Sequence, residues 1–367
     1  MKILHITEKP RFSGAEILIK DLALSHVVEN TVAITSINPP EDNFKDTMCL
    51  LKNNGVELFI PDTSLSKVQR LIFLYRVLKN FQPNVVVGHS AIVSAYMRLV
   101  GILFPTIKKV VVLHAAADYE SGGRLQKAEY LLQYFTDYVV GVSGWSSDIY
   151  KSRFIKVPCK TIFNGVDFTK FDSKYKQYRD EVRLKIFDVS ANNFVVLQVG
   201  RINKVKNQLL TLKAISKLDN KIKKNIKIIF AGIIEDKKYY EDIRSFIISN
   251  KLTQNVKFLG ARSDVNKLLY AADLYVMPSE RENFSIAILE ALSTGIPIIY
   301  SDISAFNFLN KFNYKNTYKI DLKNIETYSN AILHIIHEKI PFVQRNLKDF
   351  SFSKCSQQYM ELFKEIL

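Results

Sequence analysis

The sequence has few cysteines and no long apolar run, and both absences narrow the classes of protein to which it can belong. Its three cysteines are far apart and match neither a metal-binding nor a disulfide spacing, which indicates a reducing compartment. No stretch approaches the roughly 18 apolar residues of a membrane span. The apolar start, Met1–Thr7, is too short for a signal peptide. We therefore expect a cytoplasmic protein whose membrane contact is at most peripheral, at the inner face of the plasma membrane.

The chain is strongly basic, with 51 Lys and Arg against 36 Asp and Glu, a net charge of +15. Most of the excess lies after residue 167, in segments such as Lys170–Arg183 and Lys221–Lys227. General solvation, attraction to anionic lipid and nucleic-acid binding are three explanations for such a charge. Because no aromatic residues are interleaved with the basic ones in a binding pattern, we expect no nucleic-acid partner. Peripheral contact with an anionic membrane stays open.

The length and the pattern of apolar residues predict two α/β domains. A chain of 367 residues with 47% hydrophobic content suits two domains of ordinary size. Strand-like apolar runs alternate with amphipathic helices in two successive sets, which begin at Lys2 and Phe194. Residues 168–190 resemble a linker with a short helix. We expect doubly wound domains over 1–168 and 169–350, followed by a helix over 351–367.

Residues 278–292 are the most informative stretch, because a charged loop there joins an apolar run to a helix. The helix is expected to begin near Phe284, and Ser285 suits its start. Free backbone amides at a helix start attract phosphate. Glu282 and Glu290, eight residues apart, can grip opposite ends of a nucleotide sugar. The alternative is an ordinary strand-loop-helix unit with two solvated glutamates.

Other candidate groups also follow predicted strands, where the carboxyl ends of a parallel sheet place functional side chains. Arg201 and Lys206 follow one strand, and two cations there suit a diphosphate. His114 ends another strand, and Gly14 lies in a loop that opens a helix, where backbone can approach a phosphate. The simpler explanations are a surface cation pair, a structural histidine and a plain turn. Asp118 and Glu120 lie in a loop and are candidates for an acceptor role, and Gly122-Gly123 makes that loop flexible.

Four motifs together resemble the retaining glycosyltransferases of family four, which have the GT-B fold and an E-x7-E signature. The matching segments follow one another in the family's order: Ser13-Gly14-Ala15-Glu16, Asn164-Gly165-Val166-Asp167, Gly200-Arg201 with Lys206, and Glu282 with Glu290. The family usually reads E-G-F-G where this chain has Glu282-Asn283-Phe284-Ser285, so both glycines are replaced. The resemblance implies two Rossmann-like domains facing across a cleft, with the last helix crossing back to the first domain.

The resemblance also implies roles for individual residues. Arg201 and Lys206 would stabilise the departing diphosphate, Glu282 would bind the hexose and His114 would contact the sugar or orient the acceptor. These four are the expected catalytic residues. Glu290 would bind the ribose. The expected donor-binding residues are Gly14, Arg201, Lys206, Glu282, Asn283, Phe284, Ser285, Ile286 and Glu290.

The implied reaction transfers a hexose or N-acetylhexosamine from a nucleotide diphosphate to a saccharide or lipid-linked saccharide acceptor. A UDP-linked donor is favoured over a GDP-linked one, and the setting is bacterial surface polysaccharide, lipopolysaccharide or lipid-linked glycan assembly. The chain has no Asp-x-Asp triplet and the cations supply the phosphate charge, so we expect no metal or other cofactor. The alternatives are a non-catalytic nucleotide-sugar-binding protein and a sugar epimerase on the same fold.

Overall fold

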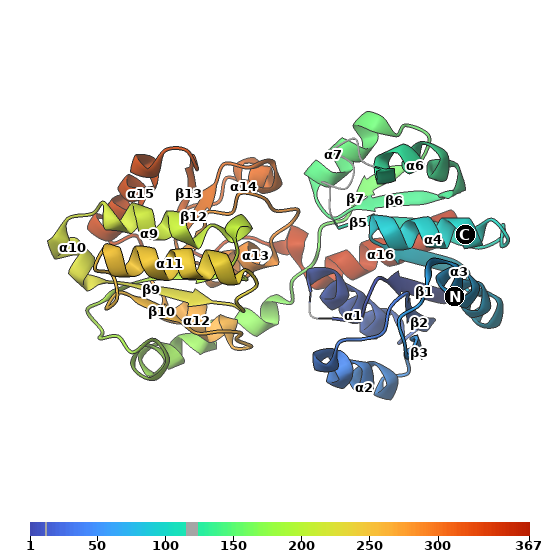
Figure 1. Ribbon diagram of the computed structural model, residues 1–367, viewed down its shortest axis with the longest axis horizontal. Coiled ribbons are helices and arrows are strands. Elements are labelled where there is room, and N and C mark those ends of the chain that lie inside the picture. Colours follow the sequence, from blue (N-terminus) through green and yellow to red (C-terminus); the bar gives the residue numbers. More distant parts are fainter. Residues whose placement is uncertain (12, 115–123) are drawn as a thin grey trace. The chain divides into compact units, whose positions relative to one another are not determined.

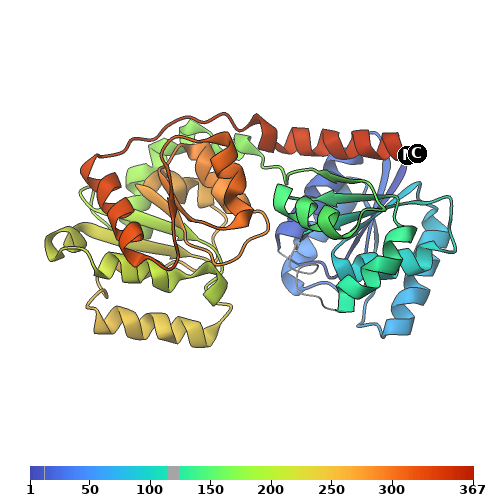
Figure 2. The same ribbon diagram turned by 90° about the horizontal axis from the view of Figure 1, so that it is seen from above.

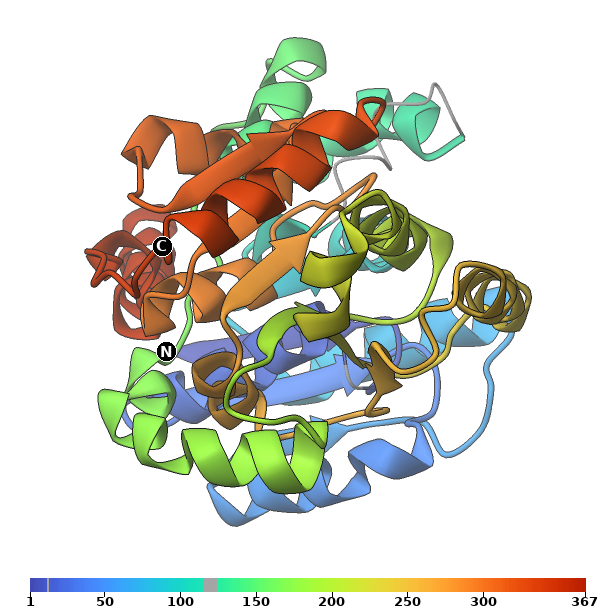
Figure 3. The same ribbon diagram turned by 90° about the vertical axis from the view of Figure 1, so that its left-hand side faces the viewer.

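The protein folds as two compact units, each built on one parallel sheet. The structure, a computed structural model, describes residues 1–11, 13–114 and 124–367. Unit 1 comprises Met1–Gly165 and Asp349–Leu367, and unit 2 comprises Val166–Lys348. Helices flank both faces of the sheet in each unit (Figures 1 and 3). Because both faces of such a sheet are covered, its strands are expected to be continuous apolar runs rather than alternating ones.

In the described part of unit 1, seven strands pair in the order β3-β2-β1-β4-β5-β6-β7, all parallel. The strands are β1 Lys2–Thr7, β2 Thr31–Ser36, β3 Glu57–Phe59, β4 Val85–His89, β5 Lys108–Leu113, β6 Tyr138–Gly141 and β7 Cys159–Thr161. The helices are α1 Gly14–His26, α2 Lys45–Asn53, α3 Lys67–Phe81, α4 Ala91–Gly101, α6 Arg124–Leu132, α7 Gly144–Arg153 and α16 Phe352–Ile366. The first three residues of β4, Val85–Val87, are wholly buried, as expected for a central strand.

The last helix, α16, belongs to unit 1, as the family resemblance implied, and it packs against α1. The hydroxyl oxygens of Ser25 and Ser356 are 2.7 Å apart, and Nε2 of His26 is 3.2 Å from the carbonyl oxygen of Ser356. Phe363 meets the edge of the His26 ring. Figure 2 shows α16 lying along unit 1, with the chain's two ends close together. The fold of unit 1 is therefore completed by residues from both ends of the chain.

In unit 2, six strands of the described chain pair in the order β10-β9-β8-β11-β12-β13, again all parallel. The strands are β8 Phe194–Val199, β9 Ile226–Ala231, β10 Val256–Phe258, β11 Leu274–Met277, β12 Ile298–Ser301 and β13 Thr317–Ile320. The helices are α8 Arg179–Glu181, α9 Gln208–Ser216, α10 Asn220–Asn225, α11 Lys237–Ser249, α12 Val265–Ala271, α13 Ile286–Thr294, α14 Asn307–Phe312 and α15 Ile325–His337.

The segment predicted to be a linker is anchored to the body of unit 2. It contains short helical turns and a π-helical stretch, Val182–Phe187. Arg179 donates to the carboxylate of Asp273 and to the carbonyl oxygens of Tyr270 and Ala272. Arg183, which is buried, also donates to Asp273. These charge-assisted bonds hold the segment against the sheet, which its composition alone did not reveal.

Strand order reverses once in each sheet, between β1 and β4 in unit 1 and between β8 and β11 in unit 2. At such a reversal the connections leave in opposite directions, and ligands bind beyond the carboxyl ends of the two strands. Lys206 follows β8 and Glu282 follows β11, so both lie beyond the reversal point of unit 2. Among the described helices, none is long and apolar enough to cross a membrane.

Candidate functional site

An ion pair links the two connections that leave the reversal point of unit 2. The ammonium of Lys206 contacts Oε1 of Glu282, and the hydroxyl of Ser279 donates to the same oxygen at 2.9 Å. The two charged side chains are 18% and 12% exposed, so the pair is mostly withdrawn from water. Gly200 lies beside the Lys206 stem with φ of +155°, a backbone conformation that residues with a side chain rarely adopt. The pair brings together two residues that the sequence predicted to share a site.

The loop after β8 is held by hydrogen bonds that fix the Lys206 backbone. Asn203 accepts a bond from the Lys206 amide at 3.0 Å, and Gln198 donates to the Lys206 carbonyl at 2.7 Å. The Glu280 amide donates to the Val205 carbonyl at 2.8 Å, which ties this loop to the one that carries Glu282. The cation is thus presented by a braced loop rather than by a freely moving one.

Helix α13 begins where the sequence predicted a phosphate-binding helix start. Ser285 is its N-cap, and its hydroxyl accepts from the Ile288 amide at 3.4 Å. The first backbone amides of a helix have no carbonyl partner within it and carry partial positive charge. Ile286 is the first residue of the helix, so its amide is one of these. The N-cap of this helix, Ser285, lies three residues after Glu282 along the chain.

Glu290 lies one turn into α13 and is half-buried. Burial raises the pKa of its carboxyl to about 7, and the positive charge of Lys170 offsets this only in part. The Tyr275 side chain on β11 is buried, and its hydroxyl finds no hydrogen-bond partner within the described chain. Burial and the charges of Glu290 and Glu282 raise the pKa of Tyr275 well above its ordinary value. Sequence reasoning missed this tyrosine, because a buried strand residue gives no signal of its own.

Arg201 is placed differently from Lys206. Its guanidinium is 59% exposed and pairs with Glu235, which also accepts from the Asn203 amide group. Glu235 lies in the loop after β9 and was not among the predicted residues. The strand ends meet closely here, since a Cβ on Gly232 would lie 2.0 Å from the Gly200 carbonyl oxygen. The structure therefore does not bring Arg201 to Glu282, and a diphosphate would have to compete with Glu235 for it.

The remaining predicted residues of this loop pack in different ways. Phe284 is buried against Phe308, with ring centroids 5.6 Å apart. Asn283 and Ile286 are half-buried. Ser285 is buried, and its hydroxyl also contacts the sulfur of Met277 at 3.0 Å. Phe284 thus anchors the loop by packing into the interior, whereas Asn283 and Ile286 retain surface that a ligand can reach.

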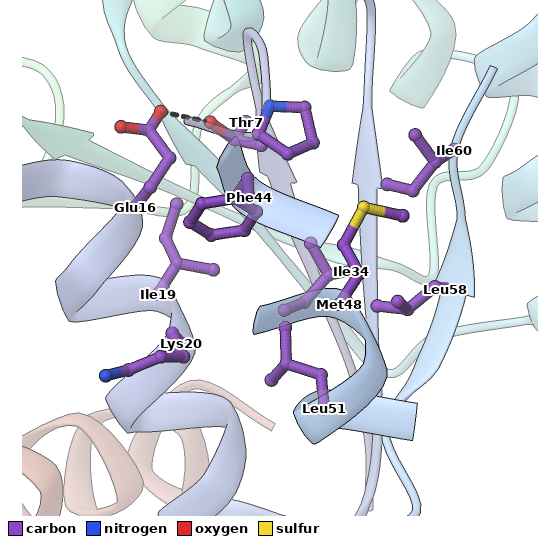
Figure 4. Close-up of a pocket in the computed structure, with 11 residues that line it drawn as sticks. Thr7, Glu16, Ile19, Lys20, Ile34, Phe44, Met48, Leu51, Leu58 and Ile60 are labelled. Carbon is purple, nitrogen blue, oxygen red and sulfur yellow. Dashed lines mark hydrogen bonds between the residues drawn. The ribbon is translucent and has the colours of Figure 1, made fainter. Parts of the chain in front are cut away.

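In unit 1, Gly14 is the first residue of α1 and is exposed. Glu16 is buried and braces the turn before it, because it accepts hydrogen bonds from Thr7 at 2.7 Å and from Ser13. Figure 4 shows Thr7 and Glu16 joined beside converging apolar side chains of α1, α2, β2 and β3. That pocket holds only about 20 Å³, roughly the space of one water molecule, so it is too small for a sugar.

His114 follows β5 and ends a chain of three histidines. Its Nε2 lies 3.0 Å from Nδ1 of His89, whose Nε2 lies 3.0 Å from Nδ1 of His5. Burial lowers the pKa of His114 to about 4 and that of His5 to about 3, and the pKa of His89 falls well below its ordinary value. All three rings are therefore neutral at physiological pH. Asp118 and Glu120, predicted for an acceptor role, and Gly122-Gly123, predicted to make their loop flexible, lie outside the described residues.

A larger cavity of about 520 Å³ in unit 2 lies away from these groups. Its lining includes Phe194, the first residue of β8, and Asp273, which directly precedes β11. The cavity is thus at the amino ends of the strands, opposite Lys206 and Glu282. Within the described residues, no group of three or more side chains could hold a metal ion.

Known proteins resemble this chain in sequence, over unit 2 and over its whole length. Residues 182–349, nearly all of unit 2, match the model of the family described as Glycosyl transferases group 1. A UDP-Gal:alpha-D-GlcNAc-diphosphoundecaprenol alpha-1,3-galactosyltransferase of Escherichia coli is 27% identical over 355 residues, covering 93% of this chain and 89% of the relative. The capsular polysaccharide biosynthesis glycosyltransferase CapH of Staphylococcus aureus is 22% identical, covering 99% of this chain and 98% of its own.

Solved structures share the fold over the whole chain. Anabaena Alr3699/HepE in complex with UDP-glucose superimposes with a TM-score of 0.83 at 19% identity, covering 100% of both chains. The lipopolysaccharide outer core galactosyltransferase WaaB has a TM-score of 0.73 at 16% identity, again over 100% of both chains. At these identities the likeness establishes the fold, which is GT-B. The match over residues 182–349 shows that unit 2 is similar to the Glycosyl transferases group 1 family.

Proposed function

We propose that the protein is a retaining glycosyltransferase that transfers a hexose or N-acetylhexosamine from a UDP-sugar to a saccharide acceptor. The observation that carries the proposal is the Lys206–Glu282 pair beside the start of α13, beyond the carboxyl ends of β8 and β11. A mostly buried cation and the first amides of a helix suit a diphosphate, and an adjacent carboxylate suits sugar hydroxyls.

The proposed roles follow from the charge that the reaction must accommodate. Departure of the sugar leaves negative charge on the diphosphate, which Lys206 and the α13 amides stabilise, and Arg201 adds to this if it exchanges Glu235 for phosphate. Lys206 also orients Glu282, whose Oε1 it shares with Ser279. The departing phosphate accepts the acceptor's proton, and the new bond forms on the face that the leaving group vacates. Glu290 binds the ribose hydroxyls.

The relatives favour a UDP-linked donor and a lipid-linked or capsular acceptor. The Escherichia coli relative is named for UDP-galactose and a diphosphoundecaprenol acceptor, and a Campylobacter jejuni relative, 24% identical over the whole chain, is named for an undecaprenol-linked glycan. We extend this acceptor class to the present protein and with it a peripheral contact with the inner face of the membrane. Exposed apolar residues on neighbouring helices of unit 1, such as Leu103 after α4 and Leu131 on α6, support such a contact.

The test combines donor binding with transfer. Thermal unfolding is followed with UDP-glucose, UDP-galactose, their N-acetylated forms and a GDP-hexose, since a bound ligand raises the melting temperature. The donor that protects is then supplied with diphosphate-linked N-acetylglucosamine, and the anomeric configuration of the product is read by NMR. We expect protection by a UDP-sugar and an α-linked product from an α-linked donor.

Other outcomes would favour the rival functions. Binding without nucleotide release in the presence of any acceptor indicates a non-catalytic binding protein. Nucleotide release with no acceptor, accompanied by an altered sugar, indicates an epimerase. A β-linked product contradicts retention, and protection only by the GDP-hexose contradicts the donor class.

A further inference from the structure

Three histidines form a diagonal row on one face of the unit 1 sheet, and the strand register explains why. Strands β1, β4 and β5 are neighbours. His5 is opposite Val87, and His89 is two residues further along β4. His89 is in turn opposite Val112, and His114 is two residues beyond that. Since alternate residues of a strand share a face, the three imidazoles lie on one face, each one step nearer the carboxyl edge than the last.

The contacts between the rings are hydrogen bonds rather than stacking. Both nitrogen–nitrogen distances are 3.0 Å, and each bond joins Nδ1 of one ring to Nε2 of the next. The ring centroids are 5.2 Å and 5.3 Å apart, which suits rings that meet edge to edge. A neutral imidazole has one N–H and one bare nitrogen. The three protons must therefore all be on Nδ1 or all on Nε2, because any other distribution breaks a bond or opposes two N–H groups.

The inner end of the chain distinguishes these two states. Nε2 of His5 is buried and finds no partner in the described part of the chain. With all protons on Nε2, this end is a buried N–H without an acceptor, which is a rare arrangement in proteins. With all protons on Nδ1, it is a bare nitrogen.

A fourth histidine on the same side of the sheet shows that a bare buried nitrogen is tolerated here. His26 of α1 lies with Nε2 3.2 Å from the Ser356 carbonyl oxygen, so its proton is on Nε2. Burial lowers the pKa of His26, which favours the neutral ring, and in the neutral ring Nδ1 is bare. That Nδ1 is buried and has no partner among the described residues. The interior beside α1 thus already accommodates a bare imidazole nitrogen.

We propose that the three hydrogen-bonded histidines all donate in one direction, outward from His5. His5 and His89 thereby hold His114 with its proton on Nδ1. His5 donates to His89, and His89 donates to Nε2 of His114. His114 therefore presents an N–H donor at the carboxyl edge of the unit 1 sheet. His5 and His89 are positioning residues, and neither needs to touch a ligand.

The consequence for chemistry rests on the proposed function. His114 serves as a hydrogen-bond donor to an oxygen of a saccharide that binds at this edge of the unit 1 sheet, and it does not accept the acceptor's proton. A proton added to Nε2 of His114 would face the N–H of His89 at 3.0 Å, so the ring can become an imidazolium only if His89 and His5 also reverse. The hydrogen bonds among the three histidines thus keep His114 a neutral donor.

The experiment reads the tautomer directly in the ligand-free, full-length protein. The protein has six histidines, so two-bond correlations in a sample labelled with ¹⁵N at histidine resolve each ring, and His114→Gln assigns its signals. We expect the Nδ1–H form of His114 to exceed the other by roughly tenfold or more, the ratio that an orphaned buried donor implies. A dominant Nε2–H form, or an averaged mixture in the wild type, would overturn the proposal.

Two variants test whether His89 is responsible. His89→Phe removes the donor, and His114 should then exchange between its two tautomers, while the signals of His334 and His337 on α15 stay unchanged. His89→Gln supplies one donor and one acceptor and should keep the Nδ1–H form. An unaltered His114 spectrum in His89→Phe would contradict the proposal. These readouts need no substrate, so they can succeed even if the protein transfers no sugar.

Discussion

At the scale of single residues, the Lys206–Glu282 pair is the feature that most constrains function. Its carboxylate and ammonium are mostly buried, and a buried ion pair is a weak source of stability because both ions lose hydration. Removing one partner leaves the other charge poorly hydrated. A pair in this position is therefore better explained by what it binds than by what it stabilises, and a diphosphate adds counter-charge for Lys206 without removing Glu282.

Replacement of Lys206 tests that explanation. Lys206→Ala should lower the rate of sugar transfer by about 10²- to 10³-fold, the usual loss when one group that stabilises developing negative charge is removed. Lys204→Ala is the matched control, since Lys204 is on the same turn and is exposed. Initial rates with a UDP-sugar are compared for the two variants. Equal rates for Lys206→Ala and the wild type would remove the residue from the site.

Glu290 predicts a specific dependence of stability on pH. Its pKa of about 7 in the folded protein exceeds its ordinary value of 4.5, so the folded state binds more protons than the unfolded state between these pH values. Stability therefore falls as pH rises from 4.5 to 7 and changes no further above that. Glu290→Gln should remove this loss. At pH 8 its free energy of unfolding should exceed that of the wild type by about 1–2 kcal/mol, after allowance for the partial exposure of the carboxyl.

Urea unfolding at several pH values measures this difference. Glu280→Gln, at an exposed carboxylate in the loop before α13, provides the control for the loss of one negative charge. Parallel profiles for the wild type and Glu290→Gln would show that the Glu290 carboxyl is not held in the protonated form.

At the scale of elements, the segment that leaves β7 meets the start of α16 at very short range. A Cβ on Gly165 would lie 2.4 Å from Cα of Phe352 and 2.8 Å from Cβ of Cys355. The Asn164-Gly165 pair, which by sequence also fits a plain turn, is thus a point of close helix packing. Gly165→Ala should destabilise the protein by about 1–3 kcal/mol, the usual cost of overpacking. Urea unfolding compares it with Gly144→Ala, whose new methyl would meet no atom within 4 Å, and equal stability of the two variants would contradict the packing.

Helices α4 and α6 provide the prediction on membrane contact. They are joined by a buried, bidentate pair between Arg98 and Glu129, with bonds of 2.7 and 2.8 Å. Leu103, which follows α4, and Leu131, on α6, are 66% and 72% exposed. The double variant Leu103→Glu/Leu131→Glu should bind vesicles containing anionic lipid more weakly in a flotation assay, by roughly tenfold or more, because charges cannot enter the lipid boundary. Ile248→Glu, at a comparably exposed position on α11, should bind like the wild type; equal binding by all three would exclude α4 and α6 as the contact.

The elements near the site show where sequence reasoning reached its limit. The placement of Lys206, Glu282 and Ser285 beyond strand ends could be predicted, because each follows an apolar strand along the chain. Glu235 and His5 could not, because the first is a loop carboxylate without a motif and the second is inside a strand. Glu235 matters because it pairs with Arg201, and His5 matters because strand register places it beside His89. Both contacts depend on tertiary structure.

At the scale of the whole molecule, the alternation of strands and helices was enough to predict two parallel α/β units, and the family resemblance implied the return of the last helix. A strand that is buried on both faces is a continuous apolar run, which can be recognised from the local sequence. Two successive sets of such strands imply two sheets. The sequence could not predict the anchoring of residues 168–190, because that depends on Asp273 some ninety residues away. Local patterns thus specified the layers, whereas ion pairs over long sequence distances specified the loops.

The central claim is that a UDP-sugar places its diphosphate beyond the carboxyl ends of β8 and β11. A crystal structure of the protein with UDP tests this most directly. The account predicts phosphate oxygens within hydrogen-bond distance of the Lys206 ammonium and of the first backbone amides of α13, with the ribose at Glu290. A diphosphate bound elsewhere, for example in the cavity beside Phe194 and Asp273, would contradict it.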